Sequence, residues 1–206
     1  RLFPQTVTGK TILYDLQKEY TMKKILSLAL ACVLALSLTA CGKNSGGSSD
    51  APADAASLLT AVWDTYTDDE KFPASGGSYD APVEDAPGAV DISDADNLNY
   101  MLTLPVEDAA KIDGAASLGH MMNANTFTCG AFHVTSKDDV GSVAQDLRDA
   151  IQSKQWMCGF PDKLVVLTYG EYVVALFGAD DLVDDFVNTM TATYTGVQTA
   201  CDEPLQ

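Results

Sequence analysis

Cysteine and histidine side chains in the second half of the sequence are the groups best suited to bind a metal or to attack a substrate. Cys129 and His133 lie four residues apart in a run typical of a β-strand, so we expect both on one face of that strand. With His120 and Cys158 they would supply the nitrogen and sulfur ligands that zinc prefers. The spacing contains no short Cys-x-x-Cys pair, however, and the chain has only two histidines. We therefore predict no metal site and no cofactor.

Catalysis by a cysteine nucleophile is the chemical alternative, with Cys129 as the nucleophile and His133 or His120 as its base. This mechanism requires a third, orienting group and an oxyanion site, and the sequence identifies neither. The sequence also contains no Gly-x-Ser-x-Gly elbow, no Ser-x-x-Lys and no His-Glu-x-x-His. We assign no catalytic residue, and an enzyme whose site is assembled from scattered residues stays open as an alternative.

A cluster of acidic and amide side chains is similar to part of a calcium-binding loop; its members are Asp91, Ser93, Asp94, Asp96 and Asn97. If Asp94 is the first position of such a loop, Asp96 fits the third. Leu98, Asn99 and Pro105 then stand where a ligand, a glycine and a bidentate glutamate are required. We favour a solvated loop held open by like-charge repulsion over an irregular calcium site.

Four aromatic side chains could line a ligand groove: Trp63, Tyr66, Trp156 and Phe160. Trp63 and Tyr66 follow the spacing of an amphipathic helix, which also carries Leu58, Leu59 and Val62. We favour core packing for this pair.

Charge and composition restrict the class of protein. The 206 residues carry a formal net charge of -17, and 47% are hydrophobic. The acidic balance argues against nucleic acid, whose phosphates need a basic face, and against an electrostatic hold on anionic lipid. The length and apolar content predict a single globular domain with additional processed or flexible segments.

The N-terminal part carries features of a secretion signal. Met22-Lys23-Lys24 is typical of the positively charged n-region of a signal peptide. Residues 25–38 follow as an apolar run of about 14 residues, which is too short to cross a bilayer as a helix. Leu38-Thr39-Ala40-Cys41 follows and resembles the lipobox of bacterial lipoproteins. The resemblance implies cleavage between Ala40 and Cys41, and lipidation of the Cys41 thiol with acyl chains such as palmitate. We therefore expect a lipid-anchored protein on the extracytoplasmic face of the cell membrane.

These features divide the chain into five segments. Residues 1–21 are expected to be an upstream extension outside the true precursor, since translation starting at Met22 would give a normal signal peptide over 22–40. The codons of Lys18 and Glu19 could then form a ribosome-binding site. Residues 41–52 are the lipidated cysteine and a Ser/Gly tether, residues 53–197 the domain with an acidic loop at 68–96, and residues 198–206 a tail.

Once Cys41 is lipidated, an odd number of thiols remains in the mature chain: Cys129, Cys158 and Cys201. A disulfide between Cys129 and Cys158 is permitted outside the cytoplasm. We favour thiols that are mostly unpaired and at least partly buried.

The periodicity of the domain predicts an α+β fold. Helices are expected over 54–66, 106–112, about 138–156 and from Asp180 to about Tyr194, and strands over 99–104, 126–135, 163–168 and 172–177; residues 116–122 read as a turn. The order strand, helix, strand, strand, helix in the second half predicts a small, mainly antiparallel sheet with amphipathic helices packed on one face.

The stretch from Ser117 to Tyr194 resembles the C-terminal domain of unknown function in uncharacterised lipoproteins of Gram-positive, mostly clostridial, bacteria. The resembling features are Met121-Met122-Asn123, Lys137-Asp138, the long amphipathic helix, Phe160-Pro161 and the hairpin with Tyr169-Gly170-Glu171-Tyr172-Val173. Phe160 stands where that family has tyrosine, and the acidic loop is a further departure. The resemblance implies a location and a fold, but no catalytic residues.

Two functional classes follow. We favour a non-catalytic envelope module that binds a protein, a peptide or a wall component, and the alternative is the extracytoplasmic enzyme. A shallow apolar patch in the structure would favour binding, whereas a cleft that gathers His120, His133, Cys129 or several aspartates would favour the enzyme.

Overall fold

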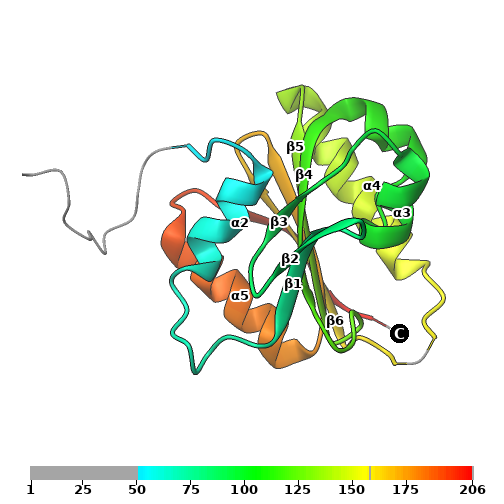
Figure 1. Ribbon diagram of the computed structural model, residues 1–206. Coiled ribbons are helices and arrows are strands. Elements are labelled where there is room, and N and C mark those ends of the chain that lie inside the picture. Colours follow the sequence, from blue (N-terminus) through cyan, green and yellow to red (C-terminus); the bar gives the residue numbers. More distant parts are fainter. Residues whose placement is uncertain (1–50, 158, 206) are drawn as a thin grey trace, which may run out of the picture. The chain divides into compact units, whose positions relative to one another are not determined.

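The computed structural model describes residues 51–157 and 159–205 (Figure 1). The predicted extension, the signal peptide, the cleavage site at Ala40 and Cys41 and nearly all of the tether therefore lie outside the described residues, as does Cys158. No helix in the described part of the chain has the length and apolarity needed to span a membrane.

An antiparallel sheet of eight strands forms the centre of the domain. Its order is β2-β1-β4-β5-β7-β6-β8, and β3 also pairs with β4. The strands are β1 (Ala74–Ser78), β2 (Ala81–Glu84), β3 (Gly88–Val90), β4 (Ile112–His120), β5 (Phe127–Val134), β6 (Lys163–Tyr169), β7 (Tyr172–Gly178) and β8 (Gln198–Pro204). The α+β class and the antiparallel sheet are thus confirmed.

Helices pack on both faces of this sheet (Figure 1). They are α2 (Ala55–Trp63), α3 (Ala95–Leu102), α4 (Val140–Gln152) and α5 (Asp180–Thr193), with short 3-10 turns η1 (Val106–Lys111) and η2 (Lys137–Asp139). The first core cluster lies between the sheet and α2 with α5, and the second between the sheet and α3 with α4. Both clusters are drawn from residues 55–205, so the domain contains its own hydrophobic core.

The prediction that the helices cover only one face is therefore wrong. Alternate residues of β5 show the reason: Cys129 and Ala131 belong to the first cluster, whereas Phe132 and Val134 belong to the second. A sheet covered on one side has strands that alternate between apolar and polar residues. The central strands are instead apolar at nearly every position, which is typical of a sheet buried on both faces.

The segment predicted as an acidic loop, residues 68–96, contains the three strands β1, β2 and β3. Its small residues let these strands lie close to β4: a Cβ on Gly76 would collide with the carbonyl oxygen of Ser117 and the amide nitrogen of Gly88. Such a strand has none of the β-branched residues by which strands are usually recognised. The prediction failed because non-local pairing, rather than local propensity, stabilises this region.

Three other local predictions were also wrong. Residues 99–104 were expected to form a strand and belong largely to α3, whose N-terminus is capped by Asp94 through a hydrogen bond from the Asn97 amide (3.0 Å). Residues 116–122, expected to form a turn, lie mostly in β4, and the predicted tail 198–206 forms β8, which pairs with β6. For β4 and β8 the sheet provides hydrogen-bond partners that the local sequence does not reveal.

Candidate binding surface

The structure places Cys129 and His133 on one face of β5, as predicted, but it does not join them into a site. Cys129 is fully buried, and burial raises the pKa of its thiol, which disfavours the nucleophilic thiolate. The four residues that separate it from His133 span roughly 13 Å of strand. Since the partner cysteine at position 158 lies outside the described residues, the disulfide stays a prediction.

His133 contacts a carboxylate and an aromatic ring rather than Cys129. Its Nδ1 lies 2.5 Å from Asp113 Oδ1, and its ring contacts Tyr172 with the centroids 4.8 Å apart. His120 lies six residues beyond Gly114, the β4 partner of His133, or roughly 20 Å away along the sheet, and its ring stacks on Phe72. Among residues 51–157 and 159–205, no group of three His, Cys, Asp or Glu side chains is placed to hold a metal.

Two carboxylates of the acidic cluster at 91–97 accept hydrogen bonds from nearby backbone amides. Asp91 Oδ1 accepts a hydrogen bond from the Ser93 amide (2.9 Å), which holds the pKa of Asp91 below its usual value. Asp94 caps α3, as described above. These two carboxylates are therefore engaged in turn and cap formation.

The aromatic residues divide between core and surface. Trp63 is buried, with Tyr66 beside it at a centroid distance of 5.3 Å, which confirms the core interpretation for Trp63. Trp156 packs on Phe177 of β7. Phe160 is 78% exposed and does not line a groove with the other three.

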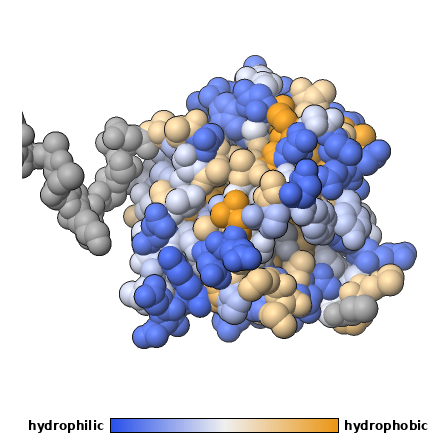
Figure 2. All heavy atoms as spheres, viewed as in Figure 1, coloured by the Kyte–Doolittle hydropathy of each residue, from blue (hydrophilic) through white to orange (hydrophobic). Residues whose placement is uncertain are grey.

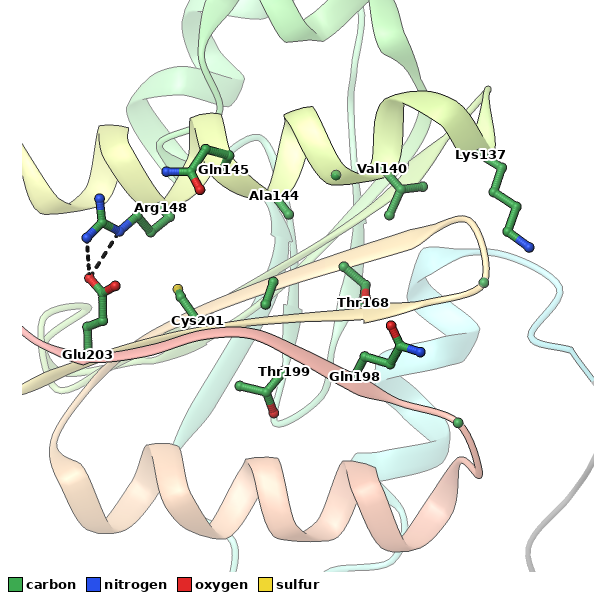
Figure 3. Close-up of a pocket in the computed structure, with 14 residues that line it drawn as sticks. Lys137, Val140, Ala144, Gln145, Arg148, Thr168, Gln198, Thr199, Cys201 and Glu203 are labelled. Carbon is green, nitrogen blue, oxygen red and sulfur yellow. Dashed lines mark hydrogen bonds and ion pairs between the residues drawn. The ribbon is translucent and has the colours of Figure 1, made fainter.

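The larger groove of the domain lies between α4 and β8 and encloses about 850 Å³ (Figure 3). Polar side chains make up most of its walls: Lys137, Gln145, Arg148, Thr168, Gln198, Thr199 and Glu203. At one end Arg148 donates two hydrogen bonds to Glu203, of 3.0 and 2.6 Å, which join the helix to the strand. This groove therefore ends at an ion pair that is already satisfied.

The outer edge of β8 is poorly suited to receive another strand. Its pairing with β6 shifts register next to Ala200, Asp202 is exposed, and Pro204 has no amide hydrogen to donate. A bulge, a charge and a proline are the devices by which natural edge strands avoid further pairing. We therefore do not place the functional site here.

A smaller groove of about 330 Å³ lies at the opposite part of the sheet, between β1, β4 and α3. Small side chains such as Ser75, Ser117 and Thr128 line it together with the larger Tyr79, Met101, Met121 and Met122. Its lining contains no Asp, Glu, Lys or Arg, although the chain as a whole is strongly acidic. We call it the neutral groove.

Exposed apolar side chains gather next to the neutral groove. Met121, Met122, Met157 and Phe160 are 53%, 79%, 78% and 78% exposed, and we call these four residues the methionine surface. The two loops that carry them are joined, because Asn125 Nδ2 donates hydrogen bonds to the carbonyls of Met157 (3.2 Å) and Gly159 (3.0 Å). Tyr79 and Tyr100, also exposed, lie against each other with centroids 6.0 Å apart.

The space-filling view shows apolar atoms among hydrophilic ones on one face of the domain (Figure 2). Exposed large apolar side chains in a group are typical of interaction sites, whereas isolated ones are ordinary. From the sequence, Met121-Met122 stood out only as a mark of resemblance, and Phe160 also as a candidate groove residue. A signal for this surface was nevertheless present, because residues 114–136 and 155–161 contain no Asp, Glu, Lys or Arg.

Comparison of the chain with models of known protein families, with curated proteins and with solved structures found no match.

Proposed function

We propose that this chain is a lipoprotein anchored through Cys41 on the extracytoplasmic face of the cell membrane, and that its domain binds a partner there. The observation that carries the proposal is the sequence Leu38-Thr39-Ala40-Cys41 at the end of the apolar run 25–38. A thioether-linked diacylglycerol with a further acyl chain would bury dozens of methylenes at roughly 0.8 kcal/mol each, which makes an effectively permanent anchor.

The charge of the protein supports a lipid anchor. With a net charge of -17, the chain is repelled by the anionic surface of a membrane and cannot be held there by basic residues. A covalently attached lipid, in contrast, holds a protein at the membrane by hydrophobic burial and does not require basic residues.

The described side chains favour binding over catalysis. The buried Cys129 thiol lies far from the His133–Asp113 pair, and the lining of the neutral groove contains one histidine, His120, and no carboxylate. The methionine surface beside that groove is, in contrast, the kind of patch that protein partners cover. The same features, with the quoted motifs, support our further proposal that the chain belongs to the uncharacterised clostridial lipoprotein family.

Metabolic labelling with palmitate tests the anchor. We expect the wild-type chain to incorporate the label and to partition with membranes at the size of the processed form. The Cys41→Ala variant should carry no label and should not reach that size. Cys32→Ala is the matched control, because it removes a cysteine from the apolar run 25–38 and leaves the lipobox unchanged.

The proposal fails if Cys41→Ala is labelled and processed like the wild type, or if the wild type carries no label. Loss of label in Cys32→Ala to the same extent would also contradict it, since the effect would then not depend on position 41.

A further inference from the structure

The methionine surface and the neutral groove form one uncharged region on an acidic domain. The loop between β4 and β5 carries Met121 and Met122, and the segment between α4 and β6 carries Met157 and Phe160. The hydrogen bonds of Asn125 hold these two loops together, so both loops contribute exposed apolar side chains to the same region. Methionine adapts its shape readily, which suits it to apolar partners of varied outline.

Exposed carboxylates border this region. Asp162 lines the same small hollow as Phe160. Asp180 and Asp181 begin α5 directly after Ala179, which also lines that hollow. Asp80 follows Tyr79, a residue of the neutral groove. In the described part of the chain, no Lys, Arg or His forms an ion pair with these four aspartates: Asp80, Asp162, Asp180 and Asp181. Among the described residues, no cation therefore neutralises their charge.

The lysines closest in sequence to this border are already engaged. Lys163 Nζ lies 2.5 Å from Asp184 and 3.1 Å from Asp202. Lys154 Nζ donates to Thr103 Oγ1 (3.0 Å) and lies over the rings of Trp156 and Phe177. The border thus presents a net negative charge around an apolar centre.

The region lies at the end of the sheet opposite to the point where the chain enters the domain. At the entry point, Pro52 accepts a hydrogen bond from the Tyr172 hydroxyl (3.1 Å), and Tyr172 pairs with His133 near the end of β5. The methionine surface lies instead next to Phe127, the first residue of β5. The six residue steps from Phe127 to His133 separate the two by roughly 20 Å. This position and the acidic border both favour a protein partner over the lipid surface.

We propose that the methionine surface and the neutral groove bind an amphipathic segment of another envelope protein, in which apolar side chains are flanked by lysine or arginine. The apolar side chains cover Met122 and Phe160 and enter the neutral groove, and the basic ones pair with the bordering aspartates. This is the helix-in-groove mode of peptide recognition with an electrostatic selection of the partner. It rests on the proposed function only in placing that partner in the envelope.

Fluorescence anisotropy with two labelled peptides tests this proposal. The probes are a 14-residue amphipathic peptide of leucine and lysine and its counterpart of leucine and glutamate. The protein is the compact unit from Gly47 to Gln206, which contains both core clusters and leaves out the apolar run 25–38. We expect the lysine peptide to bind and the glutamate peptide to bind at least about tenfold more weakly.

Two variants locate the binding. Met122→Ser with Phe160→Ser should weaken binding of the lysine peptide about tenfold or more, since few residues dominate such contacts. Asp162→Asn with Asp180→Asn should also weaken it and should flatten its dependence on salt. The matched control is Val106→Ser, at a residue of η1 that is 46% exposed and distant in sequence from both loops; its affinity should stay within about twofold.

Several outcomes would overturn the proposal. These are failure of the lysine peptide to bind, equal binding to the Met122→Ser/Phe160→Ser variant, and equal binding of the glutamate peptide. Binding of the domain to phosphatidylcholine or phosphatidylglycerol vesicles that is lost in the same double variant would assign the surface to lipid instead. Because this domain lacks Cys41, none of these outcomes depends on the anchor, and failure of palmitate labelling would leave this binding unaffected.

Discussion

Replacing Lys111 by methionine would leave the carboxylate of Asp108 buried without a charged partner. Asp108 lies in η1 with a side chain that is fully buried, and Lys111 Nζ lies 2.6 Å from its Oδ1. Its Oδ2 has no hydrogen-bond partner among the described residues. The next carboxylate, Asp146, is 3.7 Å from the same ammonium and would repel Asp108 once the lysine is gone.

The expected cost is about 2–3 kcal/mol of unfolding free energy at pH 7. Removing one partner of a fully buried ion pair costs about 3–5 kcal/mol of unfolding free energy, because the remaining charge is buried without compensation. The Lys111 side chain is 32% exposed, so water screens this pair in part, and we reduce the figure accordingly.

The cost should become smaller as the pH falls. Burial already raises the pKa of Asp108 above its usual value, and loss of the Lys111 ammonium raises it further. Between the pKa of the unfolded chain and the higher pKa of the folded one, the folded state binds more protons, so its stability increases as the pH is lowered. A protonated Asp108 needs no counter-charge, and Lys111→Met should approach the wild type near pH 4.

Urea denaturation of the unit 47–206, followed by tryptophan fluorescence at pH 7 and near pH 4, measures both effects. Lys137→Met is the control, since Lys137 is exposed, and the double variant Asp108→Leu/Lys111→Met should recover most of the stability. A cost for Lys111→Met no larger than that for Lys137→Met would refute the reasoning. So would a cost that is the same at both pH values, or a double variant no more stable than Lys111→Met alone.

Two further predictions concern the thiols and a helix cap. In a Cys158→Ser variant of this unit, a thiol reagent should modify the half-buried Cys201 in the native state and the fully buried Cys129 only in urea; rapid modification of both without urea would contradict the burial of Cys129. Asp54→Ala should cost about 1 kcal/mol by removing the cap that accepts a hydrogen bond from the Ser57 amide (2.6 Å). That bond holds the pKa of Asp54 below its usual 3.8, so the capping contribution is present above that pH and is lost as the pH falls through the lower folded-state value. A difference between Asp54→Ala and wild type that grows in acid, measured as the shift in urea midpoint, would show this assignment to be wrong.

The elements that sequence analysis predicted correctly have strong local patterns. The expected apolar stripe of α4 is buried as Val140, Val143, Leu147 and Ile151, because period 3.6 alone decides which side of a helix faces a core. The hairpin between β6 and β7 turns at Gly170, whose φ of +59° is a conformation that glycine adopts without strain.

The elements it missed depend on partners distant in the chain. β1 is Ala-Ser-Gly-Gly-Ser, a composition typical of loops, and it pairs with β4 because those small residues permit the close approach. The methionine surface has the same origin, since the loops that carry Met122 and Phe160 are brought together through Asn125 only once the sheet has formed. Local patterns therefore predicted α2, α4, α5 and the hairpin, but not α3 or the surface that the arrangement of these elements creates.

The position of β8 in the chain has a consequence for biosynthesis. β8 follows every other strand in the sequence and alone covers the outer side of β6, whose Leu164, Val165, Val166 and Leu167 are fully buried in the finished sheet. While the ribosome is still making residues 198–204, a nascent chain that folded early would leave the backbone N–H and C=O groups on that side of β6 unpaired, and such a free edge promotes aggregation. A polypeptide kept unfolded until it has been threaded across a membrane avoids that intermediate, because all eight strands then become available together.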